Sequence, residues 1–126
     1  MGMRSIEDWP VSRAAERLRR RRQKRQKALE ARRERAQEWA RSLARELGAA
    51  DSSVRQIIGF GSTFETWRNF REDSDIDLAV VGGNWFSLMR QIPEGEFEVS
   101  LIELELQPQD FIEHVRTHGD LLYERS

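Results

Sequence analysis

The sequence contains no cysteine, so disulfides, thiolate metal ligands and a cysteine nucleophile are excluded. With only two histidines, metal or acid–base chemistry falls mainly to carboxylates, and zinc binding is not expected. Long apolar runs are also missing, because stretches such as Leu78 to Val81 are far shorter than the roughly 20 residues that cross a bilayer. The first ten residues have no apolar run after a basic start. We therefore expect no membrane span, no secretory signal and a cytoplasmic location.

The net charge of -1 hides an asymmetry between the two parts of the chain. Residues 1–50 contain fifteen Lys and Arg against seven Asp and Glu, a balance of +8, whereas residues 51–126 contain six against fifteen, a balance of -9. A chain of this length has room for one domain with an appendage. The basic part is expected to meet an anionic partner or an acidic flank of the domain, and the acidic part to need a cation.

The domain organisation follows from the distribution of glycine and proline. Between Ser12 and Leu47 there is neither, and good helix formers dominate, so residues 12–48 are predicted to form one long helix between Pro10 and Gly48. Residues 1–11 form a predicted tail and residues 49–126 the domain. The second half of the helix has an apolar stripe that predicts packing on the domain; its members are Leu29, Ala36, Trp39, Ala40, Leu43 and Leu47.

The first half of the helix has a run of charge instead. Seven of the nine residues from Arg19 to Lys27 are cationic, and none is apolar. Nucleic-acid binding through phosphate contacts is one interpretation of this run. Because no base-reading motif or aromatic residue accompanies the charges, we favour a solvated helix extension and keep nucleic-acid binding as the alternative.

Residues 49–126 predict an α/β (α+β) domain: a small mixed sheet of about four strands flanked by helices. Alternating or buried apolar runs predict strands over residues 54–60, 76–81, 97–106 and 121–123. A short helix capped by Asn84 should end before Pro93, and Pro108 should open a last helix.

The strongest functional signal joins a turn to a pair of carboxylates. Gly61 and Ser62 follow the first strand, where a glycine turn with free N–H groups and a hydroxyl can bind phosphate oxygens. Asp75 and Asp77 open the next strand, and strand alternation places both carboxylates on one face, about 6.5 to 7 Å apart. That arrangement suits shared Mg²⁺ ligation. For the Asp pair alone, a solvated strand end is an equal alternative.

Together, the Gly-Ser turn and the segment Ser74-Asp75-Ile76-Asp77-Leu78-Ala79-Val80 resemble the nucleotidyltransferase superfamily of DNA polymerase beta type, in particular its minimal nucleotidyltransferase branch. The resemblance covers roughly residues 25 to 125 and implies transfer of a nucleoside monophosphate, usually AMP from ATP, to a hydroxyl acceptor. It implies that Gly61, Ser62 and Ser74 bind the nucleotide and that Asp75 and Asp77 ligate two Mg²⁺ ions.

The sequence departs from the family pattern at two places. The loop from Thr63 to Ser74 is longer than usual and contains Trp67 and Phe70, which are interpreted either as core or as a ligand surface. The third acid of the family is replaced by Ser100, which leaves Glu98, two residues earlier, as the predicted third catalytic carboxylate.

Proteins with this resemblance often serve as the antitoxin of a pair whose toxin is a helical HEPN-domain ribonuclease and the acceptor of AMP. The resemblance therefore implies an NTP substrate and such a partner. The absence of the third acid keeps a second interpretation open: an impaired fold that acts by binding its partner. His114 and His118, four residues apart, are interpreted as surface residues of the last helix rather than metal ligands.

Overall fold

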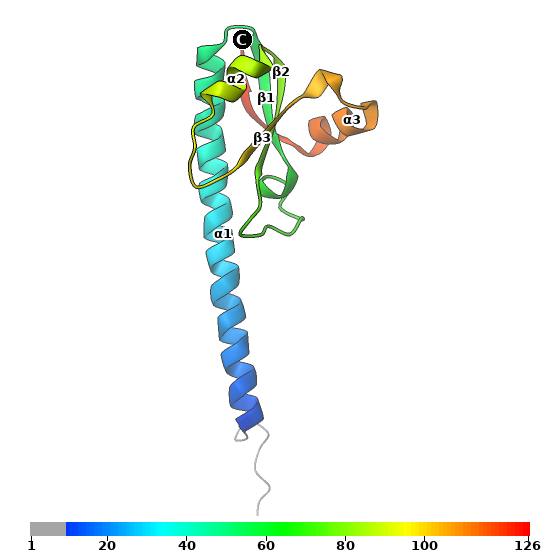
Figure 1. Ribbon diagram of the computed structural model, residues 1–126. Helices are drawn as coiled ribbons and strands as arrows, with labels where there is room; N and C mark the ends of the chain where they lie inside the picture. Colours follow the sequence, from blue (N-terminus) through cyan, green and yellow to red (C-terminus); the bar gives the residue numbers. More distant parts are fainter. Residues whose placement is uncertain (1–9) are drawn as a thin grey trace, which may run out of the picture.

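Four strands and three helices form three layers in the computed structural model, which describes residues 10–126 (Figure 1). The strands are β1 (Val54–Phe60), β2 (Ile76–Gly82), β3 (Val99–Glu103) and β4 (Asp120–Glu124). The sheet has the strand order β3-β2-β1-β4, with β1 antiparallel to β2 and β4, and β2 parallel to β3. The fold is therefore the expected α+β domain with a mixed sheet.

The sheet buries apolar residues on both faces, as a middle layer requires. Adjacent residues of one strand point to opposite faces, so Ile57 packs with α1 (Pro10–Ala50) and α2 (Trp85–Gln91), whereas Ile58 packs with α3 (Gln109–His118). In β2, Leu78 joins the first cluster and Ala79 the second. By the same alternation, Asp77 shares the face that α3 covers.

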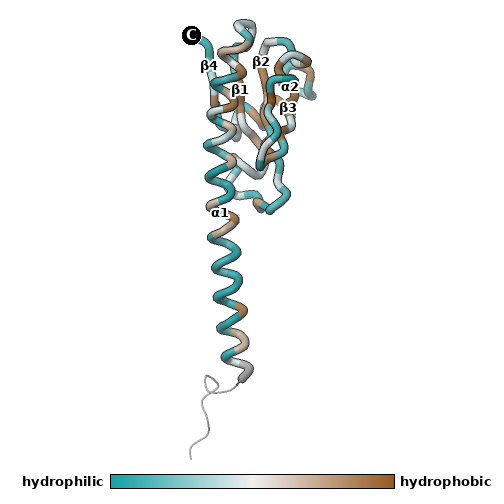
Figure 2. The backbone as a smooth tube through the Cα atoms, turned by 60° about the vertical axis from the view of Figure 1, so that its left-hand side comes forward, coloured by the Kyte–Doolittle hydropathy of each residue, from teal (hydrophilic) through white to brown (hydrophobic). Residues whose placement is uncertain are grey.

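The helix α1 begins at Pro10, two residues before the predicted start at residue 12, so residues 10 and 11 belong to the helix and not to the predicted tail. Residues 1–9 of that tail lie outside the described residues. Its second half packs on the sheet through Ala36, Ala40 and Leu43, which are 0 to 2% exposed. Most of its first half extends past the sheet (Figures 1 and 2), and the end of that half, around Arg25 and Leu29, lies beside loop residues 70–72. In Figure 2 this half is mostly hydrophilic.

The predicted end of this helix at Gly48 is wrong by two residues, because α1 continues to Ala50. Gly48 is buried inside the last turn, and a Cβ there would lie 2.3 Å from Cζ of Tyr123 on β4. The glycine therefore makes room for the tyrosine ring. A rule for helix ends considers only neighbouring residues and does not predict such a contact.

The other predicted elements are found with small changes of boundary. The Oδ1 atom of Asn84 accepts a hydrogen bond from Ser87 N at 3.0 Å, which confirms the predicted cap of α2. The strand predicted over residues 97–106 is shorter, because β3 ends at Glu103 and a 3₁₀ turn, η3 (Leu104–Leu106), follows. This turn buries Leu104 against the α3 side of the sheet.

None of the helices between residues 10 and 126 combines the length and the apolar character needed to cross a bilayer.

Candidate active site

The Gly-Ser turn lies directly against the second aspartate. Gly61 follows β1 with a φ of +73°, and a Cβ at this position would lie 2.3 Å from Oδ2 of Asp77. Residue 61 must therefore be glycine for two reasons, its backbone conformation and the carboxylate beside it. The register agrees, because Phe60 pairs with Asp77 across β1 and β2. Two sequence segments that are weak signals separately are in contact in the fold.

Buried hydrogen bonds fix the shape of this turn, the 3₁₀ segment η2 (Gly61–Thr63). Thr63 is fully buried, and its hydroxyl donates to the carbonyl oxygen of Asp75 at 3.1 Å. From α1, Gln37 Nε2 donates to the carbonyl oxygen of Thr63 at 2.8 Å. The packed half of α1 thus holds one side of the turn and the start of β2 the other.

Asp77 is an electrostatically costly residue. Burial, then the neighbouring carboxylates of Asp75 and Glu65, raise its pKa from 3.8 to about 6. Asp75 is itself exposed at the start of the strand. A bound cation would offset this destabilisation of the ionised Asp77 carboxylate, because a positive charge favours the ionised form of each carboxylate.

Glu65 is the residue that the sequence did not reveal. It is only 1% exposed, and its Oε2 atom accepts a hydrogen bond from Gly61 N at 2.5 Å. Its Oε1 atom lies 2.5 Å from His114 Nε2, and Arg68 Nε lies 3.4 Å from Oε2. An acid in a loop gives no sign of burial, and its histidine partner is 49 residues away. The buried carboxylate fixes the turn at its amide end.

Side chains from the long loop and α3 extend this network to the surface. Arg68 Nη2 lies 3.4 Å from His114 Nε2, the rings of His114 and His118 are 4.9 Å apart, and His118 meets Trp67 edge to face at 5.2 Å. Trp67 is 62% exposed, whereas Phe70 is buried beneath Arg33. The two aromatic residues of the loop therefore divide, with Phe70 in the core and Trp67 on the surface.

On the third strand a serine, rather than an acid, lies opposite Asp77. Ser100 pairs with Asp77 in the parallel register of β2 and β3, and it is exposed. Glu98 precedes the strand, and its carbonyl oxygen accepts Ile76 N at 2.8 Å, so its side chain falls on the face of Ser100 by alternation. The carboxylate that acts on Asp77 besides Asp75 is Glu65, not Glu98.

The two predicted serines differ in their surroundings. The hydroxyl of Ser74 accepts a hydrogen bond from Arg71 N at 2.8 Å and so closes the end of the loop. Ser62 lies half-buried in the turn beside Gly61. In the described part of the chain its hydroxyl has no protein partner, so it is available to a phosphate oxygen.

The donor set of this site fits Mg²⁺ rather than a softer metal, because the side chains beside the turn offer carboxylate oxygens. Between residues 10 and 126 no group of three or more His, Cys, Asp and Glu side chains is arranged as a metal site. Asp75 and Asp77 supply two carboxylates, while Glu65 is engaged with Gly61 and His114. Such a site needs further oxygens, and phosphate groups of a substrate are the usual source for Mg²⁺.

Comparison with protein families gives one match. Residues 44–126 match the family described as "Polymerase beta, Nucleotidyltransferase". No curated protein matches the chain significantly in sequence.

Solved structures with the same fold include two toxin–antitoxin crystal structures and one single protein. One, described as a toxin-antitoxin with AMP-PNP, is 20% identical and covers 68% of this chain and 74% of its own, with a TM-score of 0.55. A mutant of the toxin-antitoxin MntA-HpeT is 20% identical, covers 64% and 70%, and has a TM-score of 0.50. A putative nucleotidyltransferase from Sulfolobus solfataricus is 17% identical and covers 74% and 84%, with a TM-score of 0.51. At these identities the likeness concerns the fold.

Proposed function

Because the chain belongs to the polymerase beta nucleotidyltransferase family through residues 44–126, we propose that it transfers a nucleoside monophosphate, AMP from ATP, to a hydroxyl group. The observation that carries this proposal is the contact between the Gly61 turn and the carboxylate of Asp77. A phosphate-binding turn and a metal-binding carboxylate have to be adjacent if one nucleotide is to touch both. We assign this activity to residues 49–126 with the packed half of α1, in the cytoplasm, where ATP is available.

Each residue of the site has a task in this reaction. The Ser62 hydroxyl and the backbone N–H groups beside it bind the terminal phosphates, while Glu65 and Thr63 keep the turn in shape. Asp75 and Asp77 would hold two Mg²⁺ ions, and Glu98 would be the third carboxylate. The bound metal supplies charge neutralisation on the phosphates and lowers the pKa of the attacking hydroxyl. The acceptor hydroxyl releases its proton to solvent, its oxygen forms a bond to the α phosphorus, and the bond to pyrophosphate breaks, so that pyrophosphate leaves.

The proposed acceptor is a partner protein. A domain of this size has little surface for recognising a large acceptor alone, and two structures of the same fold are described as toxin-antitoxin complexes. We propose that this chain is the antitoxin of such a pair and modifies a helical HEPN-type toxin.

A calorimetric titration tests the site without a partner. ATP is titrated into the protein with and without Mg²⁺, using Asp77→Asn as the comparison. The proposal expects binding that requires Mg²⁺ and that the substitution abolishes. Binding of equal strength in both proteins would exclude the proposed role of Asp77.

A transfer assay then tests the reaction. The protein is incubated with Mg²⁺, ATP labelled on the α phosphate and a candidate helical partner. Label on the partner, absent with Asp75→Asn or Asp77→Asn, is the expected result. An intact site that binds Mg²⁺ and ATP but labels no partner would restrict the protein to nucleotide binding.

One observation favours a second function, an impaired enzyme that masks its partner by binding. Ser100 stands opposite Asp77 and cannot supply an anionic ligand or a base. In this case Ser100→Asp should create or strongly raise transfer activity. Unchanged activity in that variant would argue that the serine is not what limits the site.

A further inference from the structure

The projecting half of α1, residues 12–27, is here called the basic arm. Every residue from 15 to 28 is exposed. The only ion pair of the arm in the described part of the chain joins Arg20 to Glu16, at 3.4 Å. Against this one acid the arm carries nine cations: Arg13, Arg17, Arg19, Arg20, Arg21, Arg22, Lys24, Arg25 and Lys27.

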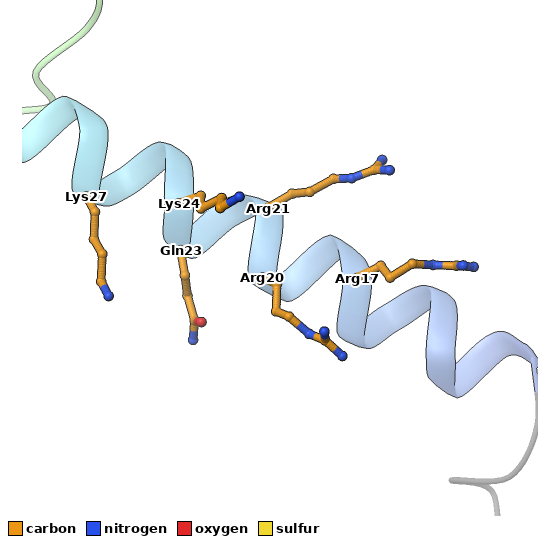
Figure 3. Close-up of a pocket in the computed structure, with 6 residues that line it drawn as sticks. All are labelled: Arg17, Arg20, Arg21, Gln23, Lys24 and Lys27. Atoms are coloured by element: carbon orange, nitrogen blue, oxygen red, sulfur yellow. The ribbon is translucent and has the colours of Figure 1, made fainter.

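The cations surround the helix. Figure 3 shows Arg17, Arg21 and Lys24 extending to one side, and Arg20, Gln23 and Lys27 to another. An open groove of about 390 Å³ lies among these six side chains. At 100° per residue, Arg13 lies on the same side as these six residues, whereas the other cations, Arg19, Arg22 and Arg25, lie on the other side of the helix. The arm therefore presents positive charge in every direction.

This distribution argues against two occupants, a membrane surface and a second arm. An anionic membrane surface selects a helix with one apolar face, and the arm has a single large apolar residue, Leu18, which is 54% exposed. A second arm is repelled by like charge. In the acidic domain of a second copy, Glu96, Glu105 and Asp120 already bind arginines of their own chain, and the carboxylates left without an ion pair make that domain the rival occupant that a self-association measurement tests.

Single-stranded nucleic acid is also a poor fit. Proteins that bind single strands combine cations with aromatic side chains on which bases stack. The arm contains no Phe, Tyr or Trp. Its charges are therefore complementary to a backbone rather than to exposed bases.

A groove with phosphates along both walls can contact cations on all sides of a helix that lies in it. A helix with its side chains is about 10–12 Å across, and the major groove of B-form DNA is about 12 Å wide, whereas the major groove of A-form RNA is deep and narrow. We propose that the basic arm binds double-stranded DNA by lying in its major groove and contacting phosphates of both strands, without sequence preference. This inference does not depend on the nucleotidyltransferase activity.

The test measures binding of the full-length protein to a fluorescently labelled DNA duplex of random sequence, by anisotropy between 50 and 300 mM NaCl. If about six phosphates are contacted, the logarithm of the binding constant falls with the logarithm of salt concentration with a slope of about -5. A variant with Arg17→Gln, Arg20→Gln, Arg21→Gln and Lys24→Gln should bind about a hundredfold more weakly at 100 mM salt and show a flatter slope.

A matched control removes the same number of charges elsewhere. Four exposed arginines outside the arm are replaced by Gln: Arg45, Arg55, Arg90 and Arg116. Affinity within about threefold of the original protein is expected, since these residues lie outside the proposed contact. Circular dichroism of both variants confirms that the helix is retained, and the ATP titration on both checks that the site is unaffected.

Four outcomes would overturn the inference. They are no duplex binding at 50 mM salt, an equal loss of affinity in the control variant, equal or tighter binding to single-stranded DNA or double-stranded RNA of the same length, and tighter binding to vesicles containing phosphatidylserine. Salt-sensitive self-association that disappears in the arm variant would assign the arm to a second copy of the chain instead.

Discussion

Like charges cluster in two regions of this molecule, the basic arm and the surroundings of Asp77, and the two clusters differ in their exposure to solvent. The nine cations of the arm are exposed and their charges are screened by water. The carboxylates near Asp77 lie at the end of the sheet, where burial and mutual repulsion raise the pKa of Asp77 to about 6. Clustered like charges therefore destabilise the folded protein little in the arm and more around Asp77, because solvent access sets the strength of electrostatic interactions.

Arginines show the same contrast within α1 itself. In the packed half, Arg32 binds Glu96 and lies 4.7 Å from the ring of Phe97, and Arg33 donates to the carbonyl oxygen of Arg68 at 2.7 Å. In the arm, the one ion pair within the described residues joins Arg20 to Glu16. Arginine is thus a structural residue in one half of the helix and an exposed charge in the other.

The largest expected effect comes from removing a charged residue in each region. Glu65→Ala leaves the Gly61 amide and His114 without their buried partner and should lower the free energy of unfolding by about 3 kcal/mol in urea. Glu16→Ala removes the exposed partner of Arg20 and should change it by less than about 0.5 kcal/mol. Equal effects of the two substitutions would remove the distinction between the regions.

A smaller effect of opposite sign is expected from Asp77→Asn. The pKa of Asp77 in the folded protein, about 6, exceeds the ordinary 3.8, so the native carboxyl holds its proton more tightly. Folding stability is therefore lost as pH rises from about 3.8 to 6 and stays low above that. After allowance for solvent screening, Asn should raise the free energy of unfolding by about 1–2 kcal/mol at pH 7.5 in the absence of Mg²⁺.

Three controls accompany this measurement. At pH 4 the gain from Asp77→Asn should be largely gone, and Mg²⁺ should raise the melting temperature of the original protein but not of the variant. Arg21→Gln in the arm should leave the free energy of unfolding within about 0.5 kcal/mol at both pH values. A gain at pH 4 as large as at pH 7.5 would show that the substitution acts by packing rather than by charge.

The smallest expected effect compares two glutamines on α1. Gln37→Ala removes the hydrogen bond to the Thr63 carbonyl and should lower the free energy of unfolding by about 1 kcal/mol. It should also weaken binding of ATP with Mg²⁺, because the turn loses its support from the helix. Gln26→Ala in the arm should change neither quantity beyond error. Loss of nucleotide affinity in the Gln26 variant would link the arm directly to the site.

Most of the fold follows from local pattern. The strand Val54–Phe60 has the predicted bounds, and the Asn84 cap is in place, because apolar alternation and capping are decided by neighbouring residues. The third strand is shorter than its alternation suggests. Leu104 leaves the sheet in a 3₁₀ turn and is buried there, which alternation alone does not distinguish from a strand.

The candidate site was partly accessible from sequence. The Gly-Ser turn after one strand and the Asp pair at the start of the next, together with their family resemblance, predicted the two segments that the fold brings together at Gly61 and Asp77. The network of Glu65 and His114 depends on a loop meeting a helix 49 residues later, and no local pattern encodes that meeting. The roles of Ser62, Ser74 and Glu98 toward a nucleotide stay predictions.

The continuity of α1 also fixes a distance. Lys24 and Gln37 belong to one unbroken helix, and thirteen residues at about 1.5 Å each separate them by roughly 20 Å along its axis. Gln37 touches the turn that is expected to receive the nucleotide. The helix therefore sets a fixed distance and direction between a ligand of the arm and the proposed nucleotide site. Inserting residues between these two points would lengthen and rotate that span without altering either end.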